Sequence, residues 1–139
     1  MEKLRTLLLD DESVICDIVK REVGKREGVE PEYLEVPTGT GKEAIELMKK
    51  EASPPNLLFI DLRLNNGLTG FDVIDWAVTN FKKDDMKIVI LTGCWEGSED
   101  WDKSVSYMNE GKVDALLGKW GIGIVLSEIG NVLDKILGK

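Results

Sequence analysis

Short, mainly apolar runs alternate along the chain with longer segments in which apolar residues recur every three or four positions. The apolar runs lie at residues 4–10, 33–36, 57–61, 87–92 and 113–119. Runs of this length and composition are typical of parallel strands that are covered on both faces. The pattern therefore predicts five strands in the interior of the protein.

The segments between these runs have the periodicity of amphipathic helices. In the first of them, we expect Val14, Ile15, Ile18 and Val19 to lie on one face. Further helices are predicted at about 41–50, 70–81, 98–110 and from 122 onward. Residues 24–32, before the second strand, are predicted to form an extended loop. Strands and helices that alternate in this way indicate an α/β fold with right-handed crossovers.

The composition of the 139 residues fits one globular domain. Hydrophobic residues make up 42% of the chain and charged residues 32%, which is usual for a soluble protein with its own core. There is no apolar run long enough to cross a membrane and no secretory signal. The net charge of −8 argues against nucleic acid as a partner, because such binding depends on clustered Lys and Arg. We therefore expect a cytoplasmic protein that binds neither membranes nor nucleic acid.

Several common kinds of site are excluded by residue type. The chain contains no histidine, so neither a Ser–His–Asp triad nor a histidine-ligated metal is possible. Cys16 and Cys94 show no metal-binding or redox spacing, and two thiols cannot form a disulfide framework.

The stretch "PTGTGKEAIELM" at residues 37–48 resembles a phosphate-binding loop at first sight. A loop of the Walker type requires glycine five residues before Gly41 and Ser or Thr after Lys42, and the chain has Val36 and Glu43 there. Thr40 and Glu43 have the spacing of a capping box. The stretch is therefore predicted to start a helix, not to bind a nucleotide.

Polar residues follow four of the five predicted strands at the point where each strand ends. They are Asp10, Asp11, Asp61, Thr92 and Lys119. Each of them alone has a structural explanation, such as capping of the following helix. Because the carboxyl ends of parallel strands meet at one edge of a sheet, where ligands bind in such folds, we expect all five to lie close together.

This combination of residue types suits phosphoryl transfer. Three carboxylates that converge repel one another, so a cation among them is expected. Carboxylate and carbonyl oxygens are the ligands that Mg²⁺ prefers. A lysine and a threonine hydroxyl can stabilise the charge on a phosphoryl group, and an aspartate can serve as the nucleophile.

Four short motifs resemble, in order and context, the signature of the receiver domain of bacterial two-component response regulators. They are "LLLDDE", "LLFIDL", "VILTG" and "LLGK". The resemblance spans the whole chain and implies a single, chemotaxis-type receiver domain over residues 1–139. It also implies a flavodoxin-like (βα)₅ fold, with five parallel strands in the order 2-1-3-4-5.

The same resemblance assigns roles to the site residues. Asp61 is expected to be the phosphoacceptor. Asp11, Asp61 and the backbone carbonyl of Arg63 are expected to ligate Mg²⁺. Asp10 is expected to hold metal-bound water and to face Lys119.

The phosphoryl oxygens are expected to be bound by Thr92 and Lys119. The implied activity is Mg²⁺-dependent self-phosphorylation and autodephosphorylation, not turnover as in an ordinary enzyme. The implied partners are a sensor histidine kinase or histidine phosphotransfer protein and an unidentified downstream protein. The chain is expected to be a monomer or a weak dimer.

The chain also departs from the pattern of this family. Leu116 stands at the position of the aromatic switch residue, and Trp120 replaces the proline that usually follows the lysine. We expect a trans peptide between Lys119 and Trp120, since a cis bond without proline costs about 2.5–4 kcal/mol. The segment between Thr92 and Lys119 is longer than usual, and no proline follows Asp61. These departures leave open an alternative, a phosphorylation-independent adaptor (pseudo-receiver) that only binds a protein partner.

Overall fold

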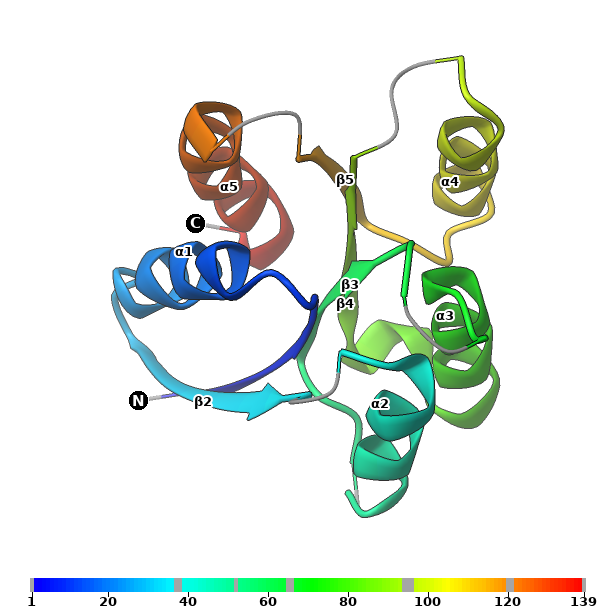
Figure 1. Ribbon diagram of the computed structural model, residues 1–139. Coiled ribbons are helices and arrows are strands. Elements are labelled where there is room, and N and C mark those ends of the chain that lie inside the picture. Colours follow the sequence, from blue (N-terminus) through cyan, green and yellow to red (C-terminus); the bar gives the residue numbers. More distant parts are fainter. Residues whose placement is uncertain are drawn as a thin grey trace.

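A computed structural model describes residues 2–36, 39–51, 53–64, 67–93, 97–119 and 122–138. Its five parallel strands form one sheet in the order β2-β1-β3-β4-β5 (Figure 1). The strands are β1 (Glu2–Leu9), β2 (Val29–Glu35), β3 (Leu57–Asp61), β4 (Lys87–Thr92) and β5 (Ala115–Gly118). This order and the parallel pairing confirm the flavodoxin-like α/β fold.

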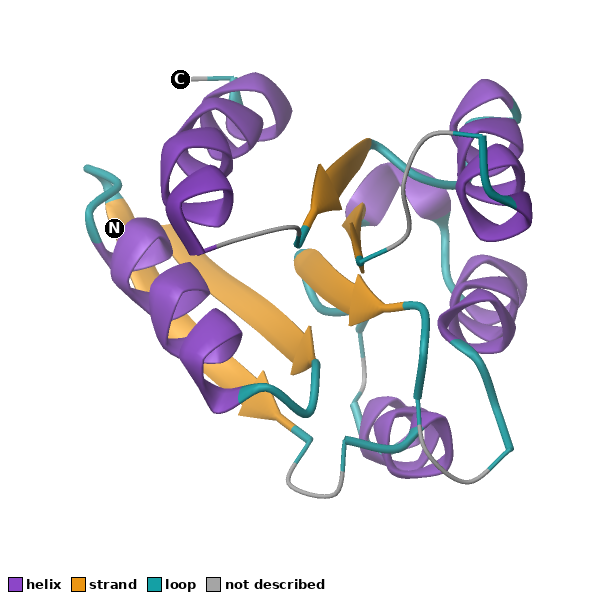
Figure 2. Ribbon diagram, turned by 45° about the horizontal axis from the view of Figure 1, so that its top comes forward, coloured by secondary structure: helices purple, strands orange, loops and turns teal. Residues whose placement is uncertain are grey.

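The helices cover both faces of the sheet. They are α1 (Ser13–Gly24), α2 (Gly41–Lys49), α3 (Gly70–Asn80), α4 (Glu99–Asn109) and α5 (Ile122–Leu137), with a short 3₁₀ helix, η1 (Lys83–Asp85). Figure 2 shows α1 and α5 on one side of the sheet and α2, α3 and α4 on the other. Within the described ranges, no helix has the length and hydropathy needed to span a membrane.

The core is divided between the two faces, because successive side chains of a strand point to opposite sides. Leu7, Ile60 and Ile90 belong to the cluster under α2, α3 and α4. Leu8 and Phe59 belong to the cluster under α1 and α5. All five are almost inaccessible to solvent. The central strands are apolar on both faces for this reason, as their sequence pattern predicts.

The second strand begins earlier than predicted. β2 starts at Val29 instead of residue 33, so four residues assigned to a loop pair with β1. The segment "VEPE" lacks the apolar run of a central strand because β2 lies at the edge of the sheet. An edge strand also tolerates Pro31, which pairs with Leu4, since one side of the strand has no neighbour.

The first helix buries a slightly different face from the one predicted. Ile15, Ile18, Val19 and Val23 are buried, but Val14 is half-exposed. Val14 lies one residue, or about 100° of rotation, from Ile15, in the first turn of the helix. Val14, which was predicted to share a face with Ile15, Ile18 and Val19, is therefore not buried with them.

Helices α2, α3 and α4 begin with side-chain caps; in α4 the Ser98 hydroxyl accepts a hydrogen bond from the Trp101 amide over 3.2 Å. The Thr40 hydroxyl accepts a hydrogen bond from the Glu43 amide over 3.3 Å, at the start of α2. A complete capping box, which was not predicted, opens α3: the Thr69 amide donates to the Asp72 carboxylate and the Asp72 amide to the Thr69 hydroxyl. The Lys119–Trp120 peptide lies outside the described residues.

Gly70, the first residue of α3, allows this helix to approach the end of β3 closely. A Cβ atom at Gly70 would lie 2.3 Å from the carbonyl oxygen of Asp61 and 2.9 Å from the Cα atom of Leu62. Both of these are backbone atoms, which cannot move aside as a flexible side chain can. The absence of a side chain at residue 70 therefore fixes how the end of β3, and with it Asp61, packs against α3.

We expect Gly70→Ala to lower the free energy of unfolding by about 1–3 kcal/mol, because the added methyl group overpacks a closed contact. Urea denaturation measures this directly. Gly93→Ala is the matched control, since a Cβ atom there meets nothing within 4 Å. Equal denaturation midpoints for the Gly70 variant and the wild type would contradict the steric argument.

Candidate functional site

The predicted site residues lie at the carboxyl edge of the sheet. Asp10 directly follows β1, Asp61 is the last residue of β3, and Thr92 is the last residue of β4. Lys119 follows β5, and its amide donates a 2.7 Å hydrogen bond to the carbonyl oxygen of Thr92. The parallel register of the strands thus brings together residues that are up to 109 positions apart in the chain.

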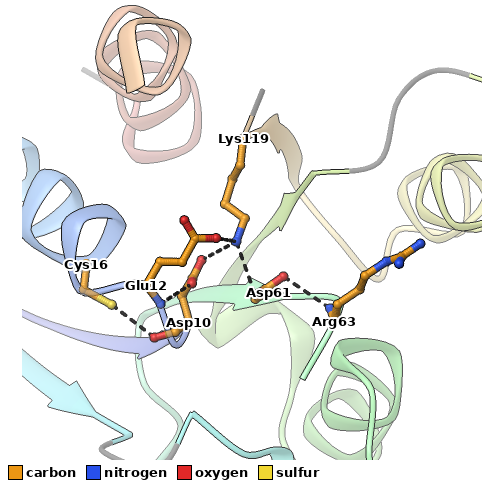
Figure 3. A network of polar contacts seen from close by, with 6 residues as sticks. All are labelled: Asp10, Glu12, Cys16, Asp61, Arg63 and Lys119. Atoms are coloured by element: carbon orange, nitrogen blue, oxygen red, sulfur yellow. Dashed lines mark hydrogen bonds and ion pairs between the residues drawn. The ribbon is translucent and has the colours of Figure 1, made fainter. Parts of the chain in front are cut away.

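The centre of the site is the ammonium group of Lys119 (Figure 3). Its Nζ atom lies 2.9 Å from Oδ2 of Asp10 and 3.2 Å from Oδ2 of Asp61. It also lies 3.0 Å from Oε1 of Glu12. The lysine, Asp10 and Asp61 side chains are each less than 10% exposed. Lys119 is therefore held in a fixed place between two buried carboxylates.

Backbone amides hold both of these carboxylates in position. The amide of Glu12 donates to Oδ1 of Asp10 over 2.8 Å. The amide of Arg63 donates to Oδ1 of Asp61 over 3.2 Å. In each case the donor lies two residues after the acid, so the turn that follows the strand orients the side chain. The second oxygen of each carboxylate faces Lys119.

Asp10, Asp11 and Asp61 form an acidic cluster. One carboxylate oxygen from each of them lies within 4.8 Å of those of the other two. Asp10 and Asp61 are buried, whereas Asp11 is exposed. A set of three carboxylates at this spacing fits a hard divalent cation that binds oxygen ligands and keeps some of its water. The donor set is consistent with a Mg²⁺ ion and also with Mn²⁺.

Burial disfavours the charged form of the central acids. The pKa of Asp61 rises to about 6, mainly because the side chain is buried and then because Asp10 is close, although Lys119 opposes the rise. Burial also raises the pKa of Asp10 against the effect of Lys119. Burial alone would lower the pKa of Lys119, but the hydrogen bond to Asp10 and the charge of Asp61 outweigh it, so the net shift is upward.

A small cavity of about 230 Å³ gives access to this cluster. Its lining residues are Asp11, Glu12, Asp61, Arg63, Gly93 and Lys119.

A neighbouring cavity of about 310 Å³ between the ends of β1 and β2 and helix α1 contains Cys16. The Cys16 thiol is 3.5 Å from the carbonyl oxygen of Asp10, and burial raises the pKa of Cys16 to about 11. The Cys16 thiol is therefore protonated at neutral pH.

Glu12 also contacts Lys119, although it was not predicted as a site residue. The presence of a third acid directly after Asp10 and Asp11 was the only signal in the sequence, and it resembled ordinary helix-start chemistry. Leu116, at the expected switch position, is partly buried and packs against the core under α2, α3 and α4. Trp120 lies outside the described residues.

Comparisons with known proteins identify the fold. No protein-family model and no curated protein matches the chain. Among solved structures, the Mn²⁺-bound form of response regulator Rcp1 is 20% identical, with a TM-score of 0.73, and the match covers 96% of this chain and 94% of that one. The phosphorylated cyanobacterial phytochrome response regulator RcpA is 17% identical, with a TM-score of 0.74, and the match covers 97% and 94%.

A two-component response regulator from Cytophaga hutchinsonii is 19% identical, has a TM-score of 0.71 and is matched over 100% of both chains. These likenesses extend over nearly the whole chain. The protein therefore has the fold of response regulator receiver domains.

The metal-free protein is expected to lose stability as the pH rises from about 4 to 6. The pKa of Asp61 in the folded protein is about 6, above the ordinary value of 3.8. The folded state therefore holds this proton more tightly than the unfolded state, and the stability gained from it is lost as the carboxyl ionises. Asp61→Asn should weaken this pH dependence and raise the melting temperature at pH 7.

Thermal unfolding in EDTA between pH 4 and 8 tests this expectation. Asp84→Asn is a suitable control, because Asp84 is exposed in η1 and lies outside the site. Parallel curves for the wild type and the Asp61 variant over this interval would show that Asp61 is not the source of the pH dependence.

Proposed function

We propose that residues 1–139 act as a receiver domain that accepts a phosphoryl group on Asp61. The observation that carries this proposal is the contact of one lysine ammonium with two buried carboxylates at the carboxyl edge of a receiver-type sheet. Burying charges in this way costs free energy. Such an arrangement favours a functional role over a purely structural one.

The reaction joins a carboxylate oxygen of Asp61 to the phosphorus atom of the donor. With a phosphohistidine donor, the P–N bond breaks and the imidazole nitrogen leaves with the electron pair. With acetyl phosphate, the P–O bond breaks and acetate leaves. Asp61 must be ionised to attack, and its raised pKa of about 6 still leaves it mainly ionised at neutral pH.

Asp11, Asp61 and the backbone carbonyl of Arg63 would hold Mg²⁺, with Asp10 contributing through a bound water. When bound, the cation supplies the positive charge that offsets repulsion among the acids and between them and a phosphoryl group. The approach of three carboxylate oxygens within 4.8 Å supports this assignment. Asp10 has a second task, since it holds the Lys119 ammonium over 2.9 Å.

Lys119 would bind an oxygen of the phosphoryl group, and the hydroxyl of Thr92 would bind another. Both are already held at the site before any donor arrives: Thr92 is buried at the end of β4 and Lys119 donates its amide to the Thr92 carbonyl. Because their backbones are fixed beside Asp61, these two residues need to move little to stabilise developing charge. The protein that donates the phosphoryl group would be a sensor histidine kinase or a histidine phosphotransfer protein.

The signal would be read through a changed surface around α4, because Leu116 offers no aromatic ring to act as a switch. Arg63 forms an ion pair with Asp100 in the first turn of α4, with 3.7 Å between Nε and Oδ2. The backbone amide of Arg63 also donates a hydrogen bond to Asp61. A change at Asp61 can therefore reach α4 through a single residue. The downstream target is a protein partner, and the chain would work as a monomer or weak dimer.

The competing function is that of an adaptor with a receiver fold that is never phosphorylated. Such an adaptor would need neither an ionisable acid at position 61 nor an accessible cavity beside it. The cavity of about 230 Å³ next to Asp61 and Lys119 therefore favours the phosphorylated receiver.

Incubation with acetyl phosphate and Mg²⁺ is expected to add one phosphoryl group to the wild type, as seen by intact-mass spectrometry. Asp61→Asn removes the nucleophile with little change in volume, so labelling should fall to background. Asp84→Asn should be labelled like the wild type. A wild type that stays unlabelled under these conditions would favour the adaptor, and a labelled Asp61 variant would move the acceptor to another acid.

Millimolar Mg²⁺ is expected to raise the melting temperature, since a ligand that binds only the folded state stabilises it by mass action. Asp11→Asn should remove most of this rise. Because Asp11 is exposed, the variant should otherwise fold normally. Identical melting curves of the wild type with and without Mg²⁺ would refute the metal site.

A further inference from the structure

The Lys119 ammonium is enclosed by carboxylates. An ammonium group has three N–H donors and no acceptor. Three carboxylate oxygens lie around Nζ: those of Asp10 at 2.9 Å, Glu12 at 3.0 Å and Asp61 at 3.2 Å. Asp10 and Glu12 accept hydrogen bonds from Nζ, so a phosphoryl oxygen that binds Lys119 must compete with carboxylates that already contact it.

Glu12 is the carboxylate that can leave most easily. Its side chain is 58% exposed, against 1% for Asp10 and 8% for Asp61. A buried carboxylate that loses its partner is left with uncompensated charge, which is strongly destabilising. An exposed one is taken up by water, and its ion pair contributes little to stability.

The Glu12 side chain also takes no part in starting its own helix. Glu12 is the N-cap residue of α1, where a side chain usually accepts a hydrogen bond from an amide of the first turn. Within the described part of the chain, the Glu12 carboxylate makes no such bond. The helix is started by its backbone instead, since the Glu12 carbonyl accepts from the amides of Ile15 and Cys16. The Glu12 carboxylate can therefore move without disturbing α1.

Glu12 lies on the side of the cluster from which a donor must arrive. It lines the cavity of about 230 Å³ together with Asp61 and Lys119. In Figure 3 its carboxylate points to the Lys119 ammonium from the connection between β1 and α1, whereas Asp61 points to it from the end of β3. A negative charge at this place repels an incoming phosphate-like anion and occupies the group that should bind it.

We propose that Glu12 is a positioning residue that competes with the phosphoryl group for Lys119. In the unphosphorylated protein its carboxylate accepts a hydrogen bond from the ammonium. When a phosphoryl group or a similar anion binds at Asp61, the carboxylate turns to solvent and Lys119 binds a phosphoryl oxygen. Glu12 thereby lowers the affinity of the site for tetrahedral, phosphate-like anions. This inference rests on the proposed function of Asp61.

The test is the affinity for beryllium fluoride, a phosphoryl analogue that binds aspartate, at saturating Mg²⁺ by calorimetry. Glu12→Gln should bind about two- to fivefold more tightly than the wild type, the effect expected for the loss of one exposed ion pair. Glu12→Ser should show the same increase in affinity. Because serine is a favoured N-cap residue, helix α1 should stay folded in this variant. The increase in affinity of the Glu12 variants should become smaller at about 1 M salt, where charges are screened within about 3 Å.

The control is Asp17→Asn, which removes another exposed acid of α1 that lines the neighbouring cavity instead of the one at Lys119. It should bind the analogue like the wild type. If this variant binds as much more tightly as the Glu12 variants do, the effect of Glu12 is only one of net charge, and the inference is overturned. Binding by the wild type with no gain in either Glu12 variant would also overturn it, while leaving the proposed function intact. If neither the wild type nor the variants bind the analogue, the proposed function fails and the inference with it. If only the Glu12 variants bind the analogue, the Glu12 carboxylate competes for Lys119 strongly enough to prevent binding by the wild type, which supports the inference.

Discussion

The contact of the Lys119 ammonium with Asp10 and Asp61 is the interaction on which the site depends. Two carboxylates that are almost fully buried cannot both be ionised at low cost without a positive charge beside them. The lysine offsets part of this cost, and its position requires β1, β3 and β5 to end at the same level. The parallel register of the sheet, and the hydrogen bond between the Lys119 amide and Thr92, provide that alignment.

One lysine does not balance the acids around it. Asp10, Glu12 and Asp61 contact a single ammonium, and Asp11 lies beside Asp10 and Asp61. Burial and the nearby Asp10 raise the pKa of Asp61. Such a cluster is easier to understand if the acids have a ligand than if they only support the fold. A divalent cation would offset much of this negative charge and leave the ammonium to contact a phosphoryl group.

Much of this arrangement could be predicted from the sequence, because the physical causes are local. Buried strands are apolar on both faces, so β1, β3 and β4 appear in the sequence as apolar runs. The site residues at the ends of these strands could then be located from the ends of the runs. β2 was predicted too short because an edge strand carries acids and Pro31 without penalty. The close approach of α3 to β3 at Gly70 depends on tertiary distance and leaves no local signal. The direction of the Glu12 side chain could not be predicted either, since an acid before a helix normally indicates capping.

The identity of the phosphoacceptor is the central claim, and chemical trapping tests it most directly. Borohydride reduces an acyl phosphate on aspartate to homoserine, which peptide mass spectrometry can locate in the chain. After treatment with acetyl phosphate and Mg²⁺, homoserine is expected at position 61 and at no other acid. Homoserine at Asp10 or Asp11, or its absence from a protein that carries a phosphoryl group, would contradict the account.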